Sequence, residues 1–160
     1  MEFVRVNDAE TLKVKTFFHN RLGIPLDFWQ GLVFFESNNG VYACTTECAS
    51  ELKELDARSA FSLGVQLFSN WKNQVPSHTA VFFVARHATA NKAEVGEGQM
   101  ENVWAGKVIA RSKVRNADAL TEGWLAITAN GVVVGSGFFS REGLKPLIAL
   151  SALAVKNRGD

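Results

Sequence analysis

Four cationic side chains recur at short intervals between Lys107 and Arg115. If this stretch is a β-strand, its side chains alternate between two faces. One face then collects Ile109 and four cations: Lys107, Arg111, Lys113 and Arg115. The other face carries residues that can pack on a core: Val108, Ala110, Ser112 and Val114. A face with four cations and no acid is typical of a surface that contacts RNA or DNA phosphates. The alternative is an ordinary solvated strand whose lysines prevent edge-to-edge association.

Residues that commonly perform catalysis are sparse in this chain. No Gly-x-Ser-x-Gly elbow surrounds a serine, and His87, the most plausible functional histidine, has no acidic residue nearby in the sequence. The Gly135-Ser136-Gly137 sequence lacks the third glycine of a dinucleotide-binding loop, because Ser140 occupies that place. We interpret these two glycines as positions in a strand where another part of the backbone approaches closely. We therefore expect no catalytic residue, no cofactor and no small-molecule substrate.

Metal binding and disulfide formation are also disfavoured. Cys44 and Cys48 are too few for a disulfide framework, and the chain has only three histidines to complete a zinc site. We expect two buried structural thiols and no metal. The tryptophans can be core anchors or platforms for base stacking, and for Trp104 and Trp124 packing is the preferred interpretation.

The overall composition is that of a globular protein with little net charge. The chain has 160 residues, of which 47% are hydrophobic and 21% are charged. Seventeen Lys and Arg against sixteen Asp and Glu give a net charge of +1, which excludes a polybasic protein and limits any polyanion contact to a local patch. No signal peptide is evident, and the apolar run from Leu147 to Val155 is too short to span a bilayer. We expect a soluble intracellular protein without a membrane partner.

The first 92 residues mix helical and strand patterns. Asn7 is a candidate N-cap for a helix that extends to about Arg21 and stops at Gly23. The Asn38-Asn39-Gly40 turn predicts a hairpin between strands at 31–36 and 41–45. Further elements are expected after these: a helix over 47–56, a strand over 60–68 and a helix that starts at Pro76-Ser77.

The remainder of the chain is dominated by strand patterns. The polar, glycine-rich stretch at 94–99 is the expected joint between two domains. Four strands are predicted beyond it, over 107–115, 123–129, 132–139 and 148–156, with Asn130-Gly131 as a strong hairpin signal. The sequence thus predicts an α+β protein, with an α/β domain over 1–92 followed by a small β pseudo-barrel over 93–160.

The order of features in the second domain resembles that of a PUA domain, a small pseudo-barrel that binds RNA. The resemblance is carried by Trp104-Ala105-Gly106, the basic strand, the Gly123-Trp124 pair and the segment from Val134 to Phe138. The whole chain is similar in length and domain order to two-domain ribosome biogenesis factors of the Nip-seven type. That resemblance implies a non-catalytic protein that acts in ribosomal RNA processing and large-subunit assembly.

The same resemblance implies partners, a location and contact residues. The partners are RNA, in particular ribosomal RNA, and ribosome-assembly proteins, and the location is cytoplasmic, or nucleolar or nuclear in a eukaryote. The expected RNA-binding residues are eight cations: Lys107, Arg111, Lys113, Arg115, Arg141, Lys145, Lys156 and Arg158. Two alternatives stay open: a protein-interaction scaffold, and an accessory subunit of an RNA-modifying complex.

Overall fold

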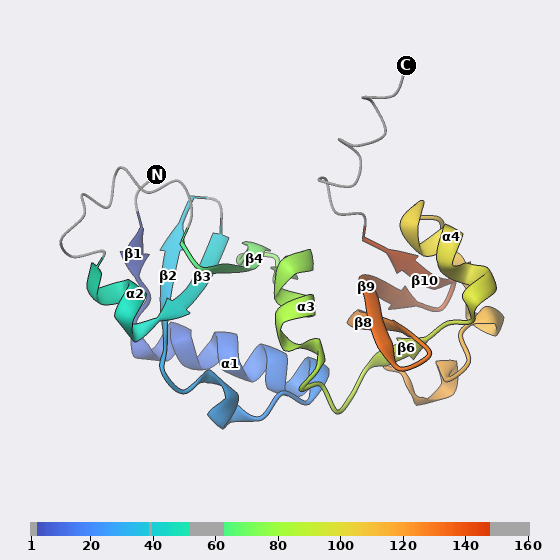
Figure 1. Ribbon diagram of the computed structural model, residues 1–160, viewed down its shortest axis with the longest axis horizontal. Coiled ribbons are helices and arrows are strands. Elements are labelled where there is room, and N and C mark those ends of the chain that lie inside the picture. The colour runs from blue at the N-terminus through green and yellow to red at the C-terminus, as the bar shows by residue number, and fades with distance from the viewer. Residues whose placement is uncertain (1–2, 39, 52–62, 148–160) are drawn as a thin grey trace, which may run out of the picture.

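Two five-stranded sheets make up the fold seen in the computed structural model, which describes residues 3–38, 40–51 and 63–147 (Figure 1). The first sheet is antiparallel and follows chain order: β1 (Val4–Arg5), β2 (Leu32–Ser37), β3 (Gly40–Thr45), β4 (Val65–Asn70) and β5 (Val75–Pro76). The second has the order β6 (Lys92–Glu94), β8 (Gly123–Ala129), β9 (Val132–Ser140), β10 (Gly143–Pro146) and β7 (Ile109–Ala110). The predicted α+β class is confirmed.

The first helix forms where its capping signals predict. In α1 (Asp8–Leu22), the Asn7 side chain accepts a hydrogen bond from the Glu10 amide at 2.9 Å, and Gly23 ends the helix with a φ of 67°. Its buried face carries Val14, Phe18 and Leu22. This face packs on the first sheet in a core that also contains Trp29, Phe34, Leu67 and Phe68.

The predicted hairpin of β2 and β3 is confirmed, with Ser37 opposite Gly40 at its turn. A short 3-10 helix (Leu26–Trp29) precedes the hairpin, and α2 (Thr46–Glu51) follows it. The predicted helix at Pro76-Ser77 is α3 (His78–Ala85), whose N-cap Ser77 accepts a hydrogen bond from the Ala80 amide. The remainder of the helix predicted to Asp56 and the start of the strand predicted from Ala60 lie outside the described residues.

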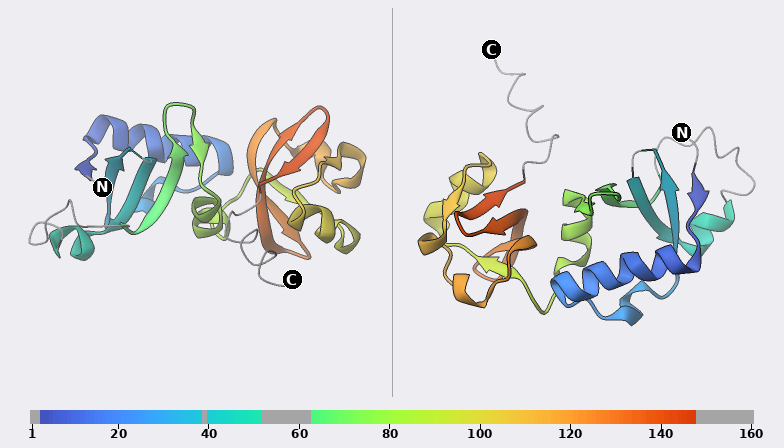
Figure 2. Two further views of the ribbon diagram at one scale, coloured as in Figure 1. Left: turned by 90° about the horizontal axis from the view of Figure 1, so that it is seen from above. Right: turned by 180° about the vertical axis from the view of Figure 1, so that it is seen from behind.

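The second sheet is strongly curled and forms a half-barrel (Figure 2). Its central hairpin, β8 and β9, turns at Asn130 and Gly131 with φ values of 51° and 76°, as the Asn-Gly signal predicts. The strand β6 runs parallel to β8, and α4 (Met100–Trp104) follows a 3-10 turn (Glu97–Gln99). The core of the half-barrel contains Val95, Val103, Ile109, Leu125, Ile127, Phe139 and Leu144.

The predicted basic strand over 107–115 is wrong. Only Ile109–Ala110 forms a strand, β7, and the chain then enters a 3-10 turn, Arg111–Lys113. Ile109 and Val114 are both buried. They are separated by an odd number of positions, so a continuous strand would place their side chains on opposite faces. The turn between them lets both side chains reach one core. Around β7 the faces are opposite to the expectation, because Ile109 is buried and Val108 is 57% exposed, whereas Val114 is buried as expected.

The second half contains two strands that the sequence patterns did not predict, β6 and β10. Glu94–Gln99, the expected joint, contributes to β6 and the 3-10 turn, and the chain crosses between the sheets at 86–91. The predicted strand over 148–156 lies outside the described residues. No helix among those described is long and apolar enough to cross a membrane.

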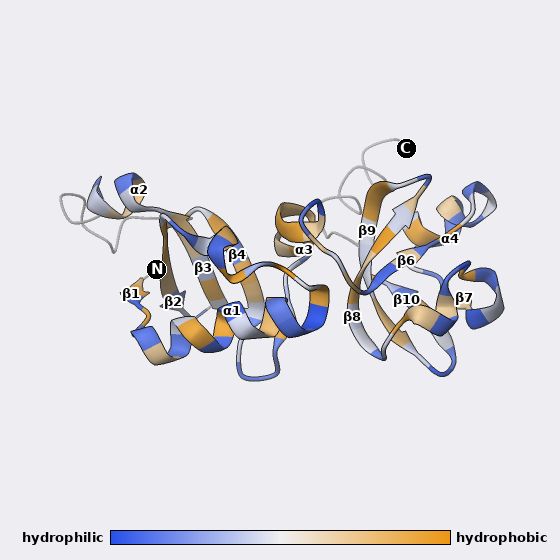
Figure 3. Cartoon of the chain, turned by 90° about the horizontal axis from the view of Figure 1, so that it is seen from below, coloured by the Kyte–Doolittle hydropathy of each residue, from blue (hydrophilic) through white to orange (hydrophobic). Residues whose placement is uncertain are grey.

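Helix α3 joins the two sheets. It stands between them in Figure 1, and Figure 3 shows that its residues are mostly hydrophobic. Its Val81 and Ala85 pack against Ala126 of β8 and Val133 of β9 in a small separate core. The outer face of the half-barrel is therefore partly covered by the N-terminal half of the chain.

Candidate nucleic-acid interface

Arg111 has partners that fix it to the half-barrel. Its guanidinium carbon lies 4.9 Å from the centre of the Phe139 ring, and its Nη2 donates to the Ala117 carbonyl at 3.2 Å. The same nitrogen lies 3.9 Å from a carboxylate oxygen of Asp118. The side chain is half-buried, so packing explains its position without a ligand.

Two further predicted cations have acidic partners. Arg115 lies 3.9 Å from Glu94, and Arg141 lies 3.6 Å from Glu122. Each acid offsets the positive charge that a phosphate would meet. The expected uniform cationic face is therefore interrupted by acids that lie far away in the sequence.

Three predicted cations remain exposed and make no ion pair among the described residues: Lys107, Lys113 and Lys145. Lys107 and Lys113 flank β7, and Lys145 lies on β10, which pairs with β7 through Leu144 and Ile109. Lys145 thus lies on a strand of the second sheet, and Lys107 and Lys113 lie on either side of the short strand that pairs with it. Lys156 and Arg158 lie outside the described residues.

Arg21 is a cation that the sequence analysis missed. From the end of α1 it reaches the half-barrel, where its Nε donates to the Trp124 carbonyl and its two Nη atoms donate to Thr121 at 2.7 and 2.8 Å. No carboxylate pairs with it in the described part of the chain. Burial lowers the pKa of Arg21, although a guanidinium stays charged at neutral pH. Its position in an amphipathic helix gave no sequence signal.

Asn91 strengthens the same junction. Its side-chain amide donates to the Arg21 carbonyl at 2.7 Å, and its oxygen accepts from the amide and hydroxyl of Thr121 at 2.9 and 3.1 Å. Asn91 has a φ of 48°, a conformation that asparagine tolerates better than most residues. Arg21, Asn91 and Thr121 together form the polar link between the two sheets.

A second polar contact crosses the junction at α3. His78 Nδ1 lies 2.9 Å from the hydroxyl of Ser136, a β9 residue that is 1% exposed. Burial of the imidazole lowers the pKa of His78. The Ser136 hydroxyl is enclosed, so this histidine and serine form a structural contact between the two halves.

Gly135 and Gly137 serve packing within β9, as the sequence analysis preferred. A Cβ atom on Gly137 would lie 2.8 Å from the Lys145 carbonyl oxygen, and one on Gly135 would lie 3.3 Å from Val103. Both glycines are within a strand and open no helix. The geometry is a close approach of β9 to β10 and α4, and differs from that of a phosphate-binding loop.

The two cysteines differ in exposure, which corrects the expectation that both are buried. Cys44 is buried on β3, and burial is the main cause that raises the pKa of its thiol to about 12. Cys48 is exposed on α2. Among the described residues, no group of three or more His, Cys, Asp or Glu is placed to hold a metal ion.

Trp104 is 68% exposed at the end of α4, which contradicts its expected packing role. Trp124 is half-buried and contacts Phe138 across the sheet, with ring centres 5.1 Å apart. His87 is exposed, accepts a hydrogen bond from Arg86 and lies against the Phe28 ring.

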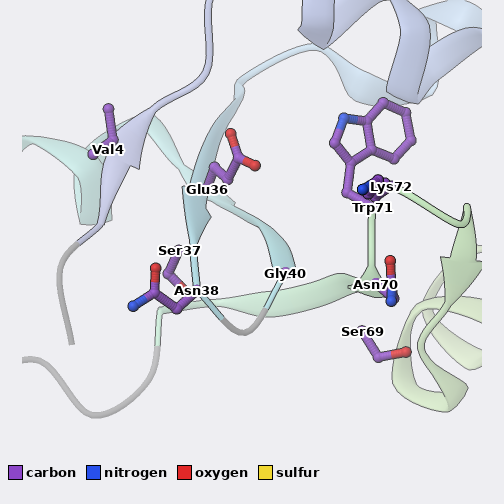
Figure 4. Close-up of a pocket in the computed structure, with 9 residues that line it drawn as sticks. All are labelled: Val4, Glu36, Ser37, Asn38, Gly40, Ser69, Asn70, Trp71 and Lys72. Carbon is purple, nitrogen blue, oxygen red and sulfur yellow. The ribbon is translucent and has the colours of Figure 1, made fainter.

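A pocket of about 560 Å³ opens at the end of the first sheet (Figure 4). Glu36, Lys72 and Trp71 line it together with small and amide side chains: Ser37, Asn38, Ser69 and Asn70. The Trp71 indole donates to Glu10 at 3.2 Å and is therefore held by α1. The six predicted cations that the structure describes do not contribute to this pocket, whose described lining mixes one acid with one base.

Comparison with known proteins gives a fold and no family. No family model matches the chain, and no curated protein matches its sequence. The crystal structure of a hypothetical protein from the hyperthermophilic archaeon Pyrococcus horikoshii OT3 is similar, with a TM-score of 0.58 and 9% identity over 91% of this chain and 93% of that one. At this identity the likeness concerns the fold alone. The chain is thus an α+β protein whose curled half-barrel is consistent with a PUA-like domain.

Proposed function

We propose that this protein is a non-catalytic RNA-binding protein that uses its PUA-like half-barrel to contact phosphates. The observation that carries the proposal is a group of three exposed lysines that make no ion pair among the described residues: Lys145 on β10, and Lys107 and Lys113 on either side of β7, which pairs with β10. Lysines that make no ion pair release counterions when they meet phosphates, which supplies affinity without sequence readout. The resemblance to Nip-seven-type factors adds the narrower proposal that the RNA is ribosomal and that the protein acts in large-subunit assembly.

The test is the salt dependence of RNA binding, measured by fluorescence anisotropy with a labelled ribosomal RNA fragment. Three phosphate contacts on single-stranded RNA predict a log–log slope of about −2 between 50 and 200 mM salt, roughly −0.7 for each contact. Changing all three lysines to glutamine is expected to remove most of that slope. The matched control is Lys72→Gln, which changes an exposed lysine in the turn between β4 and β5 and should leave the slope unchanged. Binding that does not depend on salt would contradict the proposal.

A protein-interaction scaffold is the second candidate, and one observation favours it. Trp104 is 68% exposed and Val108 is 57% exposed, and large apolar side chains of this exposure are typical of protein contact sites. Purification from cells with wild type and Trp104→Ala distinguishes the candidates. Loss of bound assembly proteins with unchanged RNA affinity would favour the scaffold.

A further inference from the structure

Two aromatic rings and one lysine form a row across the outer face of the half-barrel. Trp124 of β8 pairs with Phe138 of β9, and Phe138 pairs with Lys145 of β10. The residues next to them in sequence, such as Leu125 and Phe139, are buried in the core. Because side chains alternate along strands, the three members of this row point away from that core.

In the aromatic pair of the row, Phe138 is exposed to solvent and Trp124 is half-buried. The rings of Trp124 and Phe138 meet edge to face at 82°, and Phe138 is 40% exposed. Helix α3 covers Ala126 and Val133 on the same face but leaves Phe138 uncovered. The row is therefore an aromatic surface at the border of the helix, in which two nearly perpendicular rings lie side by side.

A cation lies at each end of the row. Arg21 binds the Trp124 carbonyl at one end and Lys145 is exposed at the other, and within the described residues neither has an acidic partner. The row spans β8 to β10, two strand spacings or roughly 10 Å. The positive charges at the two ends of the row complement a ligand in which a flat, apolar group lies between two negative charges.

We propose that this row binds unpaired bases of single-stranded RNA, with Trp124 and Phe138 contacting base faces and Arg21 and Lys145 contacting the flanking phosphates. The inference rests on the proposed function and specifies its substrate. Every base has a π-face, so aromatic platforms bind single strands with little sequence preference. A duplex hides its base faces in the stack and is recognised through its backbone and 2′-hydroxyls, so it cannot use this surface.

The experiment compares a labelled oligouridylate with an RNA hairpin duplex, using the full chain. The Phe138→Leu variant keeps an apolar side chain but removes the ring. We expect it to bind the single strand roughly tenfold more weakly and the duplex as wild type does. Phe35→Leu, a half-buried aromatic of the first sheet, is the matched control and should change neither affinity.

Trp124→Phe provides a second test that does not depend on the folding of the first variant. This variant retains a ring and is expected to keep single-strand affinity within about threefold, while the quenching of tryptophan fluorescence by RNA decreases. Equal losses for single strand and duplex in Phe138→Leu, or unchanged quenching in Trp124→Phe, would overturn the inference. Failure of the wild type to bind either RNA would instead refute the proposed function. Loss of a protein partner alone would assign the row to protein contacts and also overturn the inference.

Discussion

Cations of the same residue type lie in different environments in this protein. Arg111 and Arg115 are both arginines in one basic stretch, but Arg111 packs on Phe139 and Arg115 faces Glu94. Glu94 precedes Arg115 by 21 positions, and β6 carries it to the side of the turn. These partners could not be found from the sequence, because long-range pairing depends on the register of the sheet.

His78 is expected to make stability depend on pH. Burial lowers its pKa from an ordinary value of 6.5, so the unfolded chain binds more protons just below that value. The free energy of unfolding should be fully retained above pH 6.5 and should decrease as the pH falls toward the lowered pKa of the folded state. Urea unfolding monitored across this range measures the effect.

The control for this prediction is the exposed His87. His78→Gln should flatten the acid-side decrease in the unfolding free energy, because the titrating group is gone. His87→Gln should preserve the decrease. Identical pH profiles for wild type and His78→Gln would show that His78 does not cause the dependence.

At the scale of the elements, β9 and β10 approach each other too closely to accept a side chain at Gly137. A methyl group there would lie 2.8 Å from the Lys145 carbonyl oxygen, which is backbone and cannot move freely. We expect Gly137→Ala to destabilise the protein by about 1–3 kcal/mol. Gly98→Ala, where a Cβ atom meets nothing within 4 Å, should cost little. Thermal unfolding of both variants measures the difference, and equal costs would contradict this explanation.

Local signals predicted the elements that depend on local chemistry. The Asn7 cap, the Ser77 cap and the Asn130-Gly131 turn each form as expected. The strands β6 and β10 have only three and four residues, and such short strands form because neighbouring strands supply hydrogen bonds. Without β10, the sequence offered no reason to place Lys145 beside Phe138. The row of Trp124, Phe138 and Lys145 therefore could not be predicted from residue patterns.

At the scale of the whole molecule, Arg21 is expected to hold the two sheets together. All three of its side-chain bonds cross from α1 to the half-barrel, two to Thr121 just before β8 and one to Trp124 within it. In Arg21→Ala, hydrogen exchange at 123–129 should increase while exchange at 32–45 stays as in wild type. Arg5→Ala, which changes an exposed arginine of β1, should leave both segments unchanged. Unaltered exchange in β8 would show that apolar packing by α3 suffices.

The edge strands of both sheets are unusually short. Two residues form each of β1, β5 and β7, and three form β6. Pro76 removes an amide donor from β5, and β6 carries the charged residues Lys92 and Glu94. Such edges offer a neighbouring copy few free backbone groups on which to extend a sheet, so the fold carries built-in protection against fibrillar self-association.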